Sequence, residues 1–344
     1  MVNQSLRFTA TLYRFAPLLI FYPAVLSFWY TIYENQGGLE NVIRYWFMPV
    51  TMMFGSFIAG ATSEGGGAVA FPVMTLVLKI HPLIARDFSL IIQSVGMTAA
   101  SLWILRLGIP IEVKALAYGT CGGAVGMALG LFFVQDWFQP KYLKMFFVCV
   151  WLAYAWFLRR SASLGRQNSL PERLSFKEAL LLFTFALIGG VVSSLTGSGL
   201  DIFTFSVLTL YFRVDEKIAT PTSVILMAVN ALIGTAFQIS FSPQYLGGLE
   251  GLSALSISLW ATCVPVVLIG APLGSWFIKG KSREFIVAIL ISSIILQFLG
   301  GIFIVPHDLN LILFDLAVVG AGLLLFYLIF KGSQKKLDSE RHGA

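Results

Sequence analysis

The sequence predicts an all-α polytopic membrane protein built on an inverted repeat, and three observations lead to this prediction. First, 57% of the 344 residues are hydrophobic and only 12% are charged, whereas about a quarter of the residues of a soluble domain are charged. Second, apolar segments long enough to cross a bilayer follow one another along the chain. Third, the second half of the sequence aligns with the first over a long stretch without a gap.

The apolar segments can be placed in order along the chain. They lie near 15–33, 45–62, 68–80, 88–105, 113–134, 142–158, 179–196, 201–212, 221–240, 251–278, 285–304 and 310–330. A helix needs about 20 residues to cross a bilayer, so the segments at 68–80 and 201–212 are too short to do so. The first segment is long, rich in aromatic residues and without a small-residue cleavage site, so we expect a retained span rather than a signal peptide.

The basic residues indicate the orientation in the membrane. When the loops are placed alternately on the two sides, eighteen of the 23 Lys and Arg residues fall on one side, and the other five are Arg44, Lys79, Arg86, Lys141 and Lys144. The positive-inside rule then places both termini and the 159–178 segment in the cytoplasm. We expect the inner (cytoplasmic) membrane of a bacterial cell.

The repeat divides the chain into regions. With a shift of 134 residues, Gly55 aligns with Gly189, and the Val-x-Thr-Leu motif at 73–76 aligns with the one at 207–210. Five membrane segments separate equivalent points, and an odd number reverses the second copy, a pattern typical of secondary transporters. We expect an extra span at 1–44, a first transport repeat at 45–158, a basic cytoplasmic linker at 159–178, a second, inverted repeat at 179–304, and a last span with a cytoplasmic tail at 305–344.

Two glycine-rich stretches stand at equivalent places in the two repeats. "SEGGGAVAFP" at 63–72 and "TGSGLD" at 196–201 each precede one of the short apolar segments. Glycine allows a sharp turn, so we expect re-entrant or broken hairpins there. The N-terminus of the short helix that follows has unpaired amides and a partial positive charge, which suit an anion. The alternative is close helix packing by small residues. The candidate binding residues at the hairpins are Ser63, Gly65, Gly66, Gly67, Thr196, Gly197, Ser198 and Gly199.

Polar residues on the helices after the hairpins complete the candidate site. Ser89 and Gln93 are four residues apart and share a helix face, and Ser223 and Asn230 follow the second hairpin. Hydroxyl and amide donors suit a desolvated oxyanion, although the same groups also serve as ordinary hydrogen bonds between helices. Arg86 precedes this group directly, and we expect it and Asp87 to lie in an external loop or at a helix start.

Two carboxylates beside the glycines require a separate explanation, because a negative charge would repel an anion. Protonation of Glu64 and Asp201 as the anion arrives would couple its movement to the proton gradient. The alternative for Glu64 is a hairpin tip wetted by the cytoplasm. The alternative for Asp201 is an N-cap of the helix that follows.

Other chemistries have no signal in the sequence. The three cysteines lie in separate apolar runs, and no Cys/His cluster has the spacing of a metal site. No nucleophile has a base at usable spacing, so we expect no catalytic residue, no metal and no cofactor. The net charge of +6 reflects membrane topology rather than nucleic-acid binding. The expected partners are a small anion and the lipid bilayer; the oligomeric state is left open, with a dimer as one possibility.

The motif "SEGGGAVAFPV" followed by A-x-x-x-S, repeated as "TGSGLDIF" and A-x-x-x-S, resembles the sulfite exporter TauE/SafE family. The resemblance covers roughly residues 50 to 300. It implies secondary transport of a sulfur-containing oxyanion: sulfite, thiosulfate or an organosulfonate such as sulfoacetate or taurine. The chain departs from the family pattern in the glutamate before the first glycines and in the additional span at each end.

The expected function is therefore a secondary transporter that exports such an anion across the cytoplasmic membrane, with proton coupling through the two acids. The alternatives are a passive anion channel and an uptake carrier for a different small organic anion.

Overall fold

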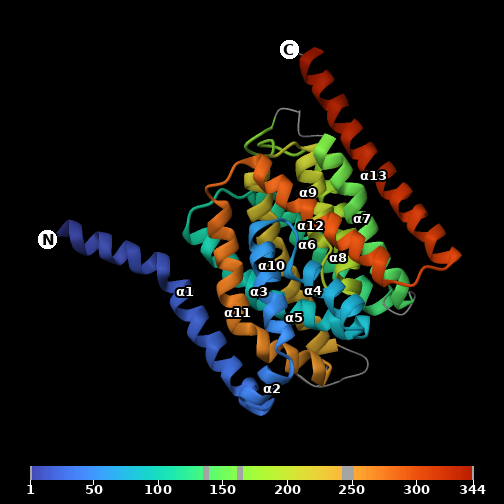
Figure 1. Ribbon diagram of the computed structural model, residues 1–344. Helices are drawn as coiled ribbons and strands as arrows, with labels where there is room; N and C mark the ends of the chain where they lie inside the picture. The colour runs from blue at the N-terminus through green and yellow to red at the C-terminus, as the bar shows by residue number, and fades with distance from the viewer. Residues whose placement is uncertain (1, 135–138, 161–165, 242–251, 343–344) are drawn as a thin grey trace.

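The computed structural model describes residues 2–134, 139–160, 166–241 and 252–342, and its regular structure is almost entirely helical (Figure 1). The helices are α1 (Val2–Asn35), α2 (Gly38–Arg44), α3 (Phe47–Ala61), α4 (Gly66–Pro72), α5 (Pro82–Arg106), α6 (Val113–Leu129), α7 (Pro140–Arg160), α8 (Phe176–Thr196), α9 (Leu200–Ser206), α10 (Glu216–Phe241), α11 (Ala254–Ile278), α12 (Arg283–Ile304) and α13 (Leu309–His342). Part of the expected linker, 161–165, lies outside the described residues.

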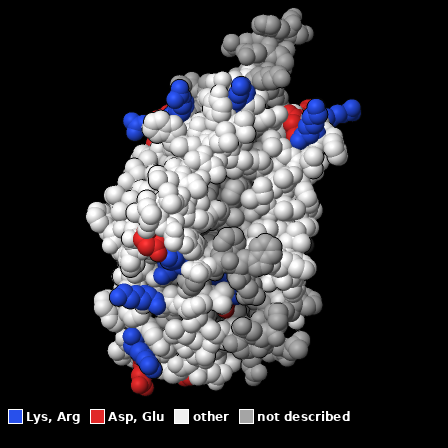
Figure 2. Space-filling model, turned by 90° about the vertical axis from the view of Figure 1, so that its right-hand side faces the viewer, with Lys and Arg blue, Asp and Glu red and all other residues white. Residues whose placement is uncertain are grey.

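The described helices have the length and composition of a multi-pass membrane protein. Nine of those in the described ranges are long and apolar enough to cross a bilayer, and α2 and α3 form a further pair bent by 80°. In Figure 2 the Lys and Arg side chains gather near the top and toward the lower left of the visible face, and the surface between them is mostly uncharged. Large apolar side chains such as Leu296 and Phe303 are exposed on α12, as expected for a surface that contacts lipid.

The helices are arranged around α5 and α10. These two helices pack against each other, and α5 is mostly buried, whereas α1, α12 and α13 are mostly exposed. Figure 1 shows α1 and α13 leaving the bundle on different sides. Helix α13 continues to His342 and so includes most of the segment expected as a tail.

Small residues bring two helix pairs into close contact. Helix α3 packs against α11, where a side chain at Gly60 or Gly274 would collide with the backbone carbonyl of the other helix. Helix α8 packs against α6 in the same way, at Gly126 and Gly190. Close approach at small residues is typical of helix packing in membranes. The short helices lie beside these pairs: α4 packs against α3 and α5, and α9 packs against α8 and α10.

The two short helices have matching local structure. Helix α4 continues into a π-helical turn, η1 (Val73–Val77), and α9 continues into another, η4 (Val207–Tyr211). Two residues after each turn stands a residue with positive φ, Lys79 at 54° and Arg213 at 55°, which is uncommon for a residue other than glycine. All three pairs of positions are separated by the same 134 residues that align the two halves of the sequence. The match supports a structural repeat, and the opposite orientation of the two copies stays a prediction.

Of the two expectations for Arg86 and Asp87, the helix start is confirmed and the external loop is wrong. Both residues lie in the first turns of α5 and are buried. The Arg86 guanidinium pairs with the Asp87 carboxylate at 2.7 Å, and Gln238 of α10 donates to the same carboxylate oxygen at 2.8 Å. A buried charge is stable only when it is paired and hydrogen-bonded, which this cluster provides.

Candidate functional site

The first hairpin, residues 62–65, joins α3 to α4. The Thr62 amide donates to Ile58 O at 2.8 Å and closes α3, and the Thr62 hydroxyl oxygen accepts from the Glu64 amide at 3.1 Å. Gly65 is extended, with φ −64° and ψ 157°, and α4 begins at Gly66. All four residues of the hairpin are buried, so its tip lies inside the protein.

The second hairpin, residues 197–199, joins α8 to α9. Gly197 has a φ of 80°, a left-handed conformation that favours glycine, and its amide donates to Ser193 O at 2.8 Å. The Leu200 amide donates to the Ser193 hydroxyl at 2.9 Å. The Thr196 hydroxyl donates within the hairpin, to Ser198 O and Val192 O, so this candidate binding residue serves the turn.

The two hairpins contact each other although they lie far apart in the sequence. The Gly65 amide donates to Asp201 Oδ2 at 3.1 Å, and the Ser198 hydroxyl donates to the same oxygen at 3.1 Å. Gln93 of α5 donates to Gly197 O at 2.7 Å and to Ser89 O at 2.9 Å. The fold thus brings both glycine stretches, Asp201 and the polar face of α5 into one buried cluster.

Close packing at this cluster depends on the absence of side chains at Gly65 and Gly67. A Cβ at Gly65 would lie 2.7 Å from Met227 Sδ and 2.9 Å from Ser198 Oγ. A Cβ at Gly67 would lie 3.1 Å from Gly197 O. Gly66 differs, because a Cβ there meets nothing closer than 3.8 Å, and Gly199 packs inside its own hairpin against Val192.

Several candidate residues have buried oxygen atoms without a hydrogen-bond partner among the described residues. These atoms are Ser63 Oγ, Glu64 Oε1, Ser89 Oγ, Asp201 Oδ1, Ser223 Oγ and Asn230 Oδ1. An unsatisfied buried polar group costs about 1–3 kcal/mol, and each one requires an explanation such as water or a ligand. A serine hydroxyl can rotate to donate to an anion. The cluster can therefore supply hydrogen-bond donors to a ligand that has lost its water.

Glu64 points away from the second hairpin, toward α12. Its Oε2 accepts from the Ser293 hydroxyl at 2.5 Å and from Gln297 Nε2 at 3.0 Å. Because Glu64 is fully buried, it is not a hairpin tip wetted by the cytoplasm. Sequence reasoning missed Ser293 and Gln297, although two polar residues four apart on a strongly apolar helix are a recognisable signal.

Asp201 lies in the first turn of α9, and the N-cap is Gly199. The N-cap alternative for Asp201 is therefore wrong. The Asp201 carboxylate instead connects the two hairpins, through its bonds with Gly65 and Ser198. The space between Gly66, Gln93, Ser56 and Gly96 is only about 10 Å³, about the size needed for one water molecule, so the cluster is closed on this side.

Most of the chain matches one known protein family. The model of the family described as "Sulfite exporter TauE/SafE" matches residues 47–300, which include both hairpins. No curated protein and no solved structure matches the chain. Within the described residues, no group of three or more His, Cys, Asp or Glu side chains could hold a metal ion. The resemblance of the glycine motifs is confirmed, and a match over most of the chain shows that this multi-pass membrane protein belongs to the sulfite exporter TauE/SafE family.

Proposed function

We propose that this protein is a secondary transporter that exports a small sulfur-containing oxyanion across the cytoplasmic membrane. Sulfite, thiosulfate and organosulfonates such as sulfoacetate are the substrates considered. The observation that carries the proposal is the buried cluster at the two hairpins, where serine hydroxyls and one amide oxygen lack partners in the described structure. The family match indicates sulfite-type anions as the ligand.

The proposed binding residues surround this cluster. Ser63, Ser89 and Ser223 supply hydroxyl donors. The Gly65 and Gly197 amides already donate, to Asp201 and to Ser193 O, and so hold the hairpins in place. Gln93 holds the second hairpin through the bond of its amide nitrogen to Gly197 O, and the Asn230 amide is proposed as a further contact for the anion. Hydrogen bonds from fixed donors replace the water that the anion loses, as binding in a low-dielectric interior requires.

Alternating access follows from the proposed inverted repeat, α3 to α7 and α8 to α12. The matching pairs α4–η1 and α9–η4 support this assignment. If the copies are inverted, the first hairpin enters the bundle from outside and the second from the cytoplasm, and both meet at the cluster. Rocking of one repeat against the other then opens the cluster to one side at a time.

Proton coupling is the proposed role of Glu64 and Asp201. Both are fully buried beside the hairpins, and each has one oxygen without a partner in the described structure. Protonation of either acid removes the charge that opposes an anion.

Glu64→Gln should change the pH dependence of transport more than the half-saturating anion concentration, because the glutamine amide has the shape of the glutamate side chain but cannot bind or release a proton. Ser292→Ala, on α12 beside Ser293, is the matched control. An unchanged pH profile removes Glu64 from the coupling scheme.

The proposal is tested by the flux of radiolabelled sulfite into everted vesicles, with and without a protonophore. Accumulation that disappears with the gradient supports a proton-linked exporter. Equal movement without the gradient favours the alternative of a passive channel. If sulfite does not move, the same assay is repeated with thiosulfate and sulfoacetate. If none of the three moves and another organic anion is taken up, the protein is an uptake carrier for a different small organic anion.

A further inference from the structure

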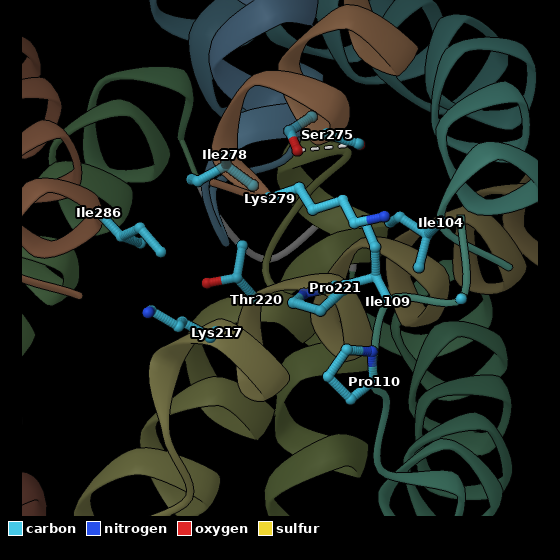
Figure 3. A pocket seen from close by; sticks show the side chains of 12 residues that line it. Ile104, Ile109, Pro110, Lys217, Thr220, Pro221, Ser275, Ile278, Lys279 and Ile286 are labelled. Carbon is cyan, nitrogen blue, oxygen red and sulfur yellow. Dashed lines mark hydrogen bonds between the residues drawn. The ribbon is translucent and has the colours of Figure 1, made fainter. Parts of the chain in front are cut away.

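A second cavity lies beside the first hairpin, separate from the closed cluster. Its volume is about 250 Å³, and its lining comes from α3, α5, α10, α11, α12 and the residues after α5. Figure 3 shows this cavity with Lys217, Thr220 and Lys279 among its labelled side chains. Ser275 donates to Gly60 O at 3.0 Å and so closes the wall nearest the first hairpin. On the same volume measure, one water molecule needs about 10–15 Å³, so this cavity can hold a small anion with several water molecules.

The charges at this cavity are positive. Its charged lining residues are Lys217 and Lys279, both exposed, and in Figure 3 they lie on different sides of Thr220. Lys279 Nζ donates to Leu107 O at 3.1 Å, which leaves further donors on the same ammonium. The nearby Glu216 carboxylate is held by Arg166 at 2.7 Å and by Arg283 at 2.5 Å, so its charge is balanced outside the cavity.

Two hydroxyl groups without hydrogen-bond partners in the described structure lie on α10, at this cavity and one turn further along the helix. Thr220 lines the cavity, is only 1% exposed, and its Oγ1 has no partner in the described structure. Ser223 follows three residues later on α10, with its Oγ also lacking a partner there. Residues three apart on a helix share a face, so the two hydroxyls form consecutive steps along α10. The next residues on this side are apolar, and Met97, Val224 and Met227 pack together between the cavity and the cluster.

We propose that this cavity is a cytoplasmic vestibule that binds the substrate anion before it passes to the hairpins. The inference rests on the proposed function and adds a site to it: Lys217 and Lys279 attract a small oxyanion or sulfonate, and the Thr220 hydroxyl donates a hydrogen bond to it. The Met97, Val224 and Met227 cluster is the barrier that the anion passes when the repeats move. The vestibule faces the side that carries most of the basic residues, where an exporter collects its substrate.

The vestibule can be tested without measuring transport. Ile109 lines the cavity and is partly exposed, so Ile109→Cys, with the exposed Cys121 changed to Ser, provides a reporter thiol. The probes are the anionic 2-sulfonatoethyl methanethiosulfonate and its cationic trimethylammonium analogue, applied to everted vesicles. We expect Lys217→Gln with Lys279→Gln to lower the ratio of anionic to cationic labelling rates about fivefold, because two nearby positive charges are lost. Methanesulfonate should slow labelling of the protein that has both lysines and should have no such effect on the double variant. Chloride at the same ionic strength should not slow labelling of either protein.

The matched control is Lys281→Gln. Lys281 is close in sequence to Lys279, but its ammonium lies over the rings of Phe277 and Phe285 rather than in the cavity. The vestibule proposal is contradicted if the ratio of anionic to cationic labelling rates is unchanged in the double variant. It is also contradicted if Lys281→Gln lowers that ratio by the same amount. If wild-type vesicles transport no sulfur oxyanion, the proposed function fails, whereas the labelling result still decides whether the cavity binds small sulfonates.

Discussion

At the scale of single residues, neighbouring glycines of the first hairpin have different surroundings. Gly65 lies against Gln93, Met227 and Ser198. Gly66 has room for a side chain, because an added Cβ would have no atom closer than 3.8 Å. The crowded atoms at Gly65 end flexible side chains, so they can shift without unfolding the protein. Their shift would disturb the bonds of the Gln93 amide to Gly197 O and of the Ser198 hydroxyl to Asp201, and with them the Gly65–Asp201 bond that joins the two hairpins.

Gly65→Ala is therefore expected to reduce anion transport at least tenfold while the protein stays folded, a change equal to about 1.4 kcal/mol at the site. Gly66→Ala is the matched control and should keep near-normal transport, because its methyl group meets only ordinary contacts. The measurements are anion flux in vesicles and melting temperature in detergent. Equal transport by the two variants would show that the Gly65 contacts do not matter for function.

At the scale of elements, one carboxylate connects the starts of α10 and α12 with the segment before α8. Glu216 is fully buried and accepts from Arg166 and Arg283. Arg166 also donates to Thr209 O at 2.7 Å, in the middle of η4, and the Gln167 amide donates to Arg213 O at 2.8 Å. The polar segment between the two proposed repeats is therefore attached to the short helix of the second hairpin.

Removal of this carboxylate should destabilise the protein strongly. Glu216→Gln leaves two guanidinium groups without their buried counter-charge, and breaking one side of such a cluster costs about 3–5 kcal/mol. Glu284→Gln, an exposed acid beside Arg283, is the control and should lower the melting temperature much less, because its charge is in water in both states. Melting temperatures of the purified variants measure both. Similar temperatures for the wild type and Glu216→Gln would mean that the cluster does not hold these elements together.

At the scale of the whole molecule, the predicted membrane orientation decides which side the proposed vestibule faces. Lys114, Arg166, Lys217 and Lys279 come from different parts of the chain and belong to the majority of basic residues predicted to face the cytoplasm. The opposite end carries the Arg86 and Asp87 cluster with Gln238. The two ends thus hold separate ionic clusters, as expected if each closes one side of the transport path.

Both termini should lie in the cytoplasm. A green fluorescent protein fused after Ala344 should fluoresce and an alkaline phosphatase at the same position should be inactive, because each reporter folds on one side only. Fusion of the same pair after Gly37, between α1 and α2, should give the opposite result. Phosphatase activity at the C-terminus would reverse the orientation and place the vestibule outside.

The sequence by itself determined the family, the all-helical membrane class and the positions of the glycine breaks. Each depends on local properties: apolar runs decide which segments enter lipid, and glycines mark where a helix can stop inside it. The spacing of 134 residues predicted that the short segments of α4 and α9 stand at equivalent places in the two halves of the chain.

The tertiary structure alone decided which side chains meet. It placed Glu64 against Ser293 and Gln297 and Asp201 against Gly65, and it buried the Arg86 and Asp87 pair near the start of α5. It also brought Lys217 and Lys279 to one cavity. Such partners are far apart along the chain, and their pairing depends on how the helices pack and which buried polar groups must be satisfied together, which no local pattern of residues specifies.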